Sequence, residues 1–166
     1  LDTVHGNTYN FDKGIVVDSR FFRPSNFLGP TNQIREILSG CKTMSLEDVV
    51  VEGSLKRGPR FKRQTAEIGT RMIGQRHLLW LEPRGQILLE GSMPEGVFAK
   101  ENTILVCAQG GADEGNTFAR CRLISKDMTK WAFSEHFLRV SSDNSVLLPE
   151  VLFVFLRSEI GYRLLL

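Results

Sequence analysis

The chain has 166 residues and a mass of 18.8 kDa, a size that suits one domain and excludes two independent catalytic domains. Its composition, 42% hydrophobic and 24% charged, is that of a globular protein and excludes wholesale disorder. The 21 basic and 19 acidic side chains leave a net charge of +2, which by itself identifies no class of partner. The distribution of charge along the chain is therefore more informative than its total.

The first 13 residues are polar and aperiodic, and we expect a loose arm there, followed by a domain over residues 14–166. Apolar residues at helical spacing predict a short helix that is capped by Thr31 and ends at Gly40. Apolar and β-branched runs then predict a series of strands. These lie at residues 49–51, 72–74, 77–81, 87–91, 103–108, 119–124 and 132–140.

The last segment predicts a helix from about residue 149, because Pro149 suits a first helical turn and Glu150 complements the helix dipole. Its wide apolar face consists of Val151, Leu152, Phe155, Leu156 and Ile160. Since the run stops on three leucines, we expect this helix to be truncated. Together the elements predict an α+β (mixed α/β) single domain, with a twisted, mostly antiparallel or mixed sheet, a short N-terminal helix and a C-terminal helix.

The three cysteines, Cys41, Cys107 and Cys121, are odd in number and have no C-x-x-C spacing, which disfavours a disulfide framework and a zinc site. We expect buried thiols, with a disulfide between Cys107 and Cys121 across a hairpin as the less favoured alternative. No run approaches the roughly 18 apolar residues of a membrane span, and the first residues lack an export signal. These features predict a cytoplasmic protein.

Positive charge is concentrated between residues 54 and 81. Seven basic side chains and one acidic side chain give this window a charge of +6, whereas the remaining 14 basic and 18 acidic residues give −4. Within the window, KRGPRFKR places five cations in eight residues around Gly58 and Pro59, which disfavour a helix. Such a loop repels itself unless an anion compensates, and arginine suits both phosphate oxygens and the guanine edge. The alternative is a solvated cationic loop without a partner.

Two groups of residues in this window are candidates for contact with DNA. Those expected to neutralise phosphates are Lys56, Arg57, Arg60, Lys62 and Arg63. Those expected to reach base edges from a strand end, around a turn at Gly74, are Arg71, Gln75 and Arg76. Phe61 is expected to anchor the basic loop to the core, the alternative being stacking on a base.

Motifs of several enzyme classes are missing from the chain. It contains no acid-x-Lys pair of metal-dependent nucleases, no Pro-Pro-aromatic strand of amino-methyltransferases and no G-x-S-x-G nucleophile turn. The histidines are too dispersed for a metal helix, and His136 is expected to be structural, on an alternating strand. The glycines of QGGADEGNT accompany Asp113 and Glu114, which would repel phosphate. We therefore expect a non-catalytic protein with no metal and no cofactor.

Three segments resemble a known family. They are Asn102–Val106 with Gly110, Ser134–Arg139, and Pro149–Gly161. In order and spacing they are similar to an x-D-I-L-V-x-x-x-G strand and turn, an S-x-H/N-hydrophobic-x-R strand, and a P-x-Y-L-aromatic-x-F-L-x-S-x-x-G helix. These motifs are typical of the target recognition domain of the specificity subunit in Type I restriction-modification systems. The earlier part of the chain, from about residue 20, is similar in arrangement but less specific.

The resemblance implies a non-catalytic module that reads a specific sequence in double-stranded DNA and directs methyltransferase and restriction subunits to it. A complete specificity subunit has two such domains separated by long helices, so we expect one half of a larger protein or a one-domain form that dimerises. Because base-reading loops vary with the target, no base contact is carried over. The alternative function is a protein-interaction module that docks through its apolar C-terminal helix. RNA binding is less favoured because aromatic stacking residues are sparse.

Overall fold

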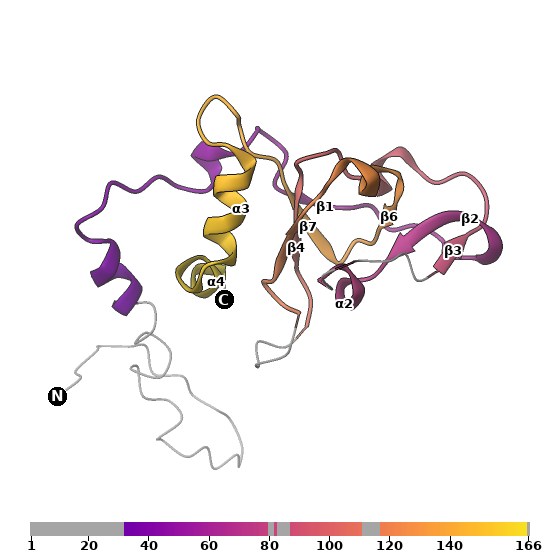
Figure 1. Ribbon diagram of the computed structural model, residues 1–166, viewed down its shortest axis with the longest axis horizontal. Coiled ribbons are helices and arrows are strands. Elements are labelled where there is room, and N and C mark those ends of the chain that lie inside the picture. Colours follow the sequence, from indigo (N-terminus) through magenta and orange to yellow (C-terminus); the bar gives the residue numbers. More distant parts are fainter. Residues whose placement is uncertain (1–31, 80–81, 83–86, 111–116, 166) are drawn as a thin grey trace, which may run out of the picture. The chain divides into compact units, whose positions relative to one another are not determined.

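The computed structural model describes residues 32–79, 82, 87–110 and 117–165 (Figure 1). The chain divides into two compact units, residues 1–43 and 44–166. In the first unit a helix spans residues 32–38, and the chain turns at Gly40, as the sequence predicted. The expected polar arm, the expected domain start at residue 14 and the expected cap at Thr31 lie outside the described residues.

The second unit is an α+β fold with two mostly antiparallel sheets, which confirms the predicted fold class (Figure 1). The four-stranded antiparallel sheet has the order β1-β7-β4-β5. Its strands are β1 (Lys56–Arg57), β4 (Ile104–Cys107), β5 (Cys121–Leu123) and β7 (Phe137–Val140). In the three-stranded sheet, β2 (Thr65–Ile73) pairs antiparallel with β3 (Ile87–Leu89) and parallel with β6 (Ala132–Phe133). The single sheet expected from the sequence is therefore divided in two.

The helices of this unit are short. They are α2 (Gln75–Leu78), α3 (Pro149–Arg157) and α4 (Glu159–Leu165), with 3-10 turns η2 (Glu47–Val49), η3 (Glu95–Val97) and η4 (Lys126–Lys130). Helix α3 begins at Pro149, as predicted. None of the helices in the described part of the chain is long and apolar enough to cross a lipid bilayer.

The C-terminal helical segment is interrupted at Ser158, which separates α3 from α4. The Ser158 hydroxyl donates a 2.6 Å hydrogen bond to the carbonyl of Phe155 and accepts a 3.1 Å bond from the backbone N–H of Gly161. It thereby caps the first turn of α4. A Cβ atom at Gly161 would overlap with the Phe155 carbonyl oxygen, so glycine is required at this close approach.

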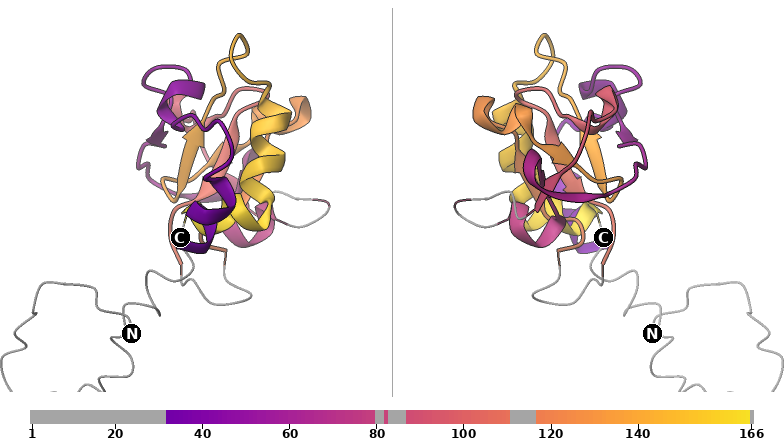
Figure 2. Two further views of the ribbon diagram at one scale, coloured as in Figure 1. Left: turned by 90° about the vertical axis from the view of Figure 1, so that its left-hand side faces the viewer. Right: turned by 90° about the vertical axis from the view of Figure 1, so that its right-hand side faces the viewer.

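The four-stranded sheet has an apolar core on each face. On one face the buried residues include Leu105, Cys107 and Phe137, together with Ile73 and Phe133 of the other sheet. On the opposite face they include Ile104, Val106 and Val140, together with Leu152 and Leu156 of α3. Figure 2 shows α3 and α4, in yellow, covering this second face. Because both faces are covered, every residue of β4 is buried, which explains why this run lacks the apolar–polar alternation of a half-exposed strand.

The predicted strands at 72–74, 87–91, 103–108 and 119–124 are confirmed by β2, β3, β4 and β5. The strand predicted at 49–51 is wrong, because η2 ends at Val49 and the following Val50 forms one isolated bridge with Ser142. The strand predicted at 77–81 is also wrong over residues 77–79, since the chain is helical up to Leu78, and residues 80–81 lie outside the described part of the chain. Short apolar runs of this length do not distinguish a strand from a buried helical turn.

The single strand predicted at 132–140 is two strands in different sheets. Residues Ala132–Phe133 form β6 and Phe137–Val140 form β7. His136 therefore lies in the turn between them, not on an alternating strand. This turn is one of the connections between the two sheets, and it brings the Ser134–Arg139 motif to their junction.

The two cysteines of the β4–β5 hairpin are buried free thiols, as predicted. Cys107 belongs to the core on one face of the sheet and Cys121 to the core on the other. Burial raises the pKa of Cys107 to about 12 and that of Cys121 to about 11. Both thiols therefore remain protonated at neutral pH, and neither is poised for reaction.

Candidate nucleic-acid interface

The predicted phosphate-contacting residues begin on β1, which is an outer strand of the four-stranded sheet. Lys56 lies level with Arg139 of β7, and Arg57 lies level with Leu138. Because successive side chains of a strand point to opposite faces, Lys56 and Arg57 are exposed on different sides of this edge. Arg57 also donates a 3.2 Å hydrogen bond to the carbonyl of Ala108. The two cations thus lie along the edge of the sheet and do not share one of its faces.

The loop after β1 is held by Phe61. This ring is half-buried and packs against the core of Met72, Leu89, Val97 and Ala132, which confirms its predicted anchoring role. The flanking Arg60 and Lys62 are exposed, and within the described residues neither forms an ion pair. They line a shallow groove that also contains Glu90. Anchoring of Phe61 therefore fixes the backbone from which these two cations project into solvent.

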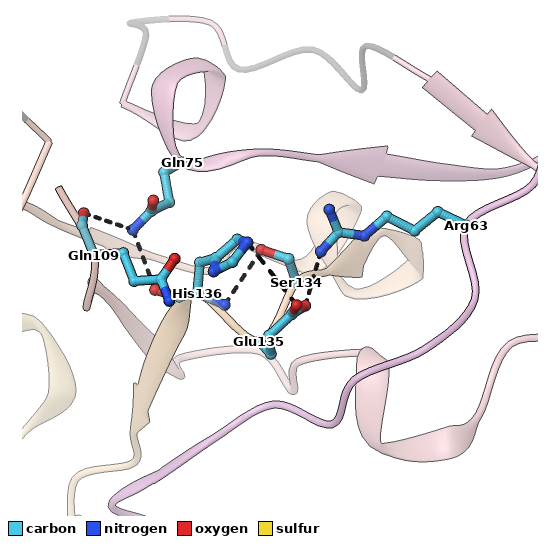
Figure 3. A network of polar contacts seen from close by, with 6 residues as sticks. All are labelled: Arg63, Gln75, Gln109, Ser134, Glu135 and His136. Atoms are coloured by element: carbon cyan, nitrogen blue, oxygen red, sulfur yellow. Dashed lines mark hydrogen bonds and ion pairs between the residues drawn. The ribbon is translucent and has the colours of Figure 1, made fainter.

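Arg63 differs from its neighbours because it is already paired within the protein. Its Nη2 atom lies 2.8 Å from Oε2 of Glu135 (Figure 3). Its guanidinium also lies 5.7 Å from the centroid of the Phe61 ring. Burial alone would raise the pKa of Glu135, but a backbone hydrogen bond and the charges of Arg63 and His136 hold it below its ordinary value. Glu135 is therefore ionised at neutral pH and neutralises Arg63.

The residues predicted to reach base edges lie in three different environments. Arg71 is exposed on β2, level with Leu88 of β3. Gln75 begins α2, and its Nε2 atom donates hydrogen bonds to the carbonyls of His136, at 3.1 Å, and Gln109, at 3.3 Å (Figure 3). Gln75 thus ties α2 to the ends of β4 and β7, a structural role that its sequence position did not predict. The turn expected at Gly74 is the N-cap of α2.

Arg76, the last of these residues, lies away from the basic loop and lines a pocket of about 420 Å³ beside β5. Sequence reasoning missed the other polar residues of this pocket. They are Arg120, Arg122, Arg157, Thr117 and Tyr162. One signal was present in the sequence: Arg120 and Arg122 are two residues apart at a predicted strand, a spacing that places both side chains on one face. Arg157 and Tyr162 join them only through the packing of α3 and α4.

No protein-family model matches the chain, and no curated protein matches it.

Three polar residues of the motifs, Ser134, Arg139 and Ser158, have structural roles in this chain. Ser134 is buried, and its hydroxyl accepts a 3.4 Å hydrogen bond from the backbone N–H of His136. The Arg139 guanidinium donates to the carbonyls of Phe98 at 2.7 Å and Val97 at 3.0 Å. These contacts and the cap at Ser158 hold the chain in its fold, which accounts for the positions of these residues in the motifs.

Proposed function

We propose that the chain is a non-catalytic, cytoplasmic DNA recognition module that binds a specific sequence in double-stranded DNA, as in a Type I restriction-modification specificity subunit. The observation that carries this proposal is the group of exposed cations on β1 and the loop after it. We call this group the cationic edge: Lys56, Arg57, Arg60 and Lys62. Because Arg63 is neutralised by Glu135, it is left out of this group. Cations held on an anchored backbone suit phosphate contacts, which position a protein on DNA.

Sequence reading requires side chains that enter a groove, and the β2–β3 ribbon supplies them. A two-stranded antiparallel ribbon fits the major groove of B-DNA. The pairing of β2 with β3 shifts between Thr65 and Thr70, and within this irregular stretch Ile68 is 88% exposed. Arg71 follows on the same strand and is exposed. An arginine can read guanine and an apolar side chain can contact a thymine methyl group, so these two residues are our candidates for base contact.

Selection of binders from a randomised pool of duplexes tests this proposal and yields the recognised sequence. If the cationic edge neutralises four phosphates, the logarithm of the association constant should fall with the logarithm of salt concentration at a slope of about −3.5. Replacing Lys56 and Lys62 by glutamine should weaken binding to all duplexes and flatten this slope. Replacing Arg71 by glutamine should instead relax the preference at one base position. Failure to enrich any sequence, or an affinity independent of salt, would contradict the proposal.

A second candidate function is protein interaction through α3, because this helix exposes apolar side chains. Val151, Val154 and Phe155 are 51%, 66% and 41% exposed, and Val151 and Phe155 belong to the apolar face expected from the sequence. The proposed partners of a recognition module are methyltransferase and restriction subunits, or a second copy of the chain. Sedimentation of the chain over a range of concentrations tests the last of these. Val151→Asp with Val154→Asp should abolish a dimer that uses this face and leave affinity for duplex DNA unchanged.

A further inference from the structure

The pocket beside β5 gathers arginines from three elements of the second unit. Arg76 comes from α2, Arg157 from the end of α3, and Arg120 and Arg122 from the segment that forms β5. In the described part of the chain β5 is an outer strand of the sheet, and residues of α2, α3 and α4 complete the lining of the pocket beside it. Its remaining walls are neutral, and no carboxylate belongs to its described lining.

The charges in this pocket act on one another. Burial lowers the pKa of Arg122, the nearby charge of Arg157 lowers it further, and Asp127 acts in the opposite direction. Asp127 therefore offsets part of the positive charge but lies outside the lining. Two guanidinium groups that repel each other in a concave site are stabilised by an anion that enters between them.

Two of the four guanidinium groups lie against aromatic rings. Arg120 lies 4.2 Å from the centroid of the Tyr162 ring, and Arg157 lies 5.7 Å from that of Phe153. Such contacts restrict the orientation of a guanidinium before a ligand arrives, which reduces the entropy lost on binding. Planar guanidinium groups bind phosphate oxygens through paired hydrogen bonds.

We infer that this pocket is a binding site for a small molecule that carries a diphosphate group. Four arginines supply more positive charge than a single phosphate needs, and a volume of about 420 Å³ also leaves room for an organic group. Leu79, Leu156 and Tyr162 provide apolar surface for that group. The site is distinct from the cationic edge, because β1 and β5 are the two opposite outer strands of the sheet. It does not depend on the proposed function in DNA recognition.

Calorimetric titration of the full chain with sodium pyrophosphate tests this inference, with sodium sulfate and sodium chloride at equal ionic strength as controls. We expect saturable binding of one pyrophosphate per chain and weaker binding of sulfate. Arg122→Gln with Arg157→Gln should weaken pyrophosphate binding at least about 10-fold, because each guanidinium makes charge-assisted hydrogen bonds. The matched variant Lys56→Gln with Lys62→Gln removes the same charge from the cationic edge and should change it less than about 2-fold, since distant exposed charges are screened.

The same two double variants are then titrated with duplex DNA, which separates this inference from the proposed function. Loss of duplex binding only in the Lys56/Lys62 variant, with pyrophosphate binding lost only in the Arg122/Arg157 variant, supports two separate sites. If pyrophosphate binding does not saturate, or if both variants weaken the affinity for pyrophosphate equally, the inference is wrong. It is also wrong if the Arg122/Arg157 variant weakens duplex binding while pyrophosphate fails to bind, because the pocket then belongs to the DNA surface. Should that variant not fold, the exposed Arg76→Gln provides the same comparison.

Discussion

Arg139 on β7 donates a 2.7 Å hydrogen bond from Nη1 to the backbone carbonyl of Phe98, in the segment that follows η3. A second bond, of 3.0 Å from Nη2, reaches the carbonyl of Val97. Burial lowers the pKa of this arginine, so the protein partly desolvates a charge in order to make these bonds. The guanidinium thereby connects the four-stranded sheet to the segment that covers the core of the other sheet, where Val97 is buried.

Arg139→Met should consequently destabilise the second unit. The substitution keeps much of the aliphatic side chain but leaves two backbone carbonyls without their donor, which reduces the free energy of unfolding by about 1–3 kcal/mol. Arg163→Met is the matched control, because Arg163 is exposed and pairs only with Glu159 of the same helix among the described residues. Such surface pairs contribute about 0.5 kcal/mol or less. Urea denaturation of both variants checks the difference, and equal losses would contradict the role assigned to Arg139.

Gly161→Ala should destabilise the junction of α3 and α4. The new methyl group would overlap with the carbonyl oxygen of Phe155, and neither backbone segment can move without loss of the cap at Ser158. Overpacking of this kind reduces the free energy of unfolding by about 1–3 kcal/mol. At Gly40 a Cβ atom would meet nothing within 4 Å, so Gly40→Ala is the control and should leave the unfolding midpoint unchanged. A Gly161→Ala protein as stable as the parent would refute the close approach.

The pair Arg63–Glu135 makes a prediction for DNA binding that depends on the proposed function. Since Glu135 neutralises Arg63 across 2.8 Å, Glu135→Gln removes a negative charge and frees the guanidinium. We expect this variant to bind duplex DNA about 2- to 5-fold more tightly at low salt, with a steeper salt dependence. Conversely, Arg63→Ala should weaken binding less than Arg60→Ala, because Arg60 has no ion-pair partner in the described part of the chain. Fluorescence anisotropy with one labelled duplex compares the four proteins, and the opposite order for the two arginines would reject the interpretation.

The sequence predicted elements well where local chemistry decides them. Pro149 and Glu150 mark the start of α3, and the runs at β3, β4 and β5 are strands as expected. It failed where tertiary packing decides: the run at 132–140 is divided because Phe133 and Phe137 both point into one core from different sheets. The pairing of Arg63 with Glu135 joins residues 72 positions apart, and no local pattern records it. The arginine pocket was missed for the same reason, since α2, β5 and α3 meet only in the folded chain.

The thiols of the β4–β5 hairpin provide a prediction that needs no ligand. Cys41 is exposed, whereas Cys107 and Cys121 are buried, with pKa values raised to about 12 and about 11 from an ordinary 9.0. Iodoacetamide should therefore label Cys41 quickly at neutral pH and leave the other two unmodified until the protein is unfolded, as peptide mass spectrometry would show.

A raised pKa means that folding favours the protonated thiol, so its contribution to stability is complete below pH 9 and is lost as pH rises toward 11 and 12. Between about pH 8 and about pH 10.5 the free energy of unfolding of the parent should fall by roughly 1–2 kcal/mol per thiol, relative to the double variant Cys107→Ala with Cys121→Ala. If the free energy of unfolding of the two proteins changes with pH in the same way, the thiols are exposed to solvent, which contradicts their burial.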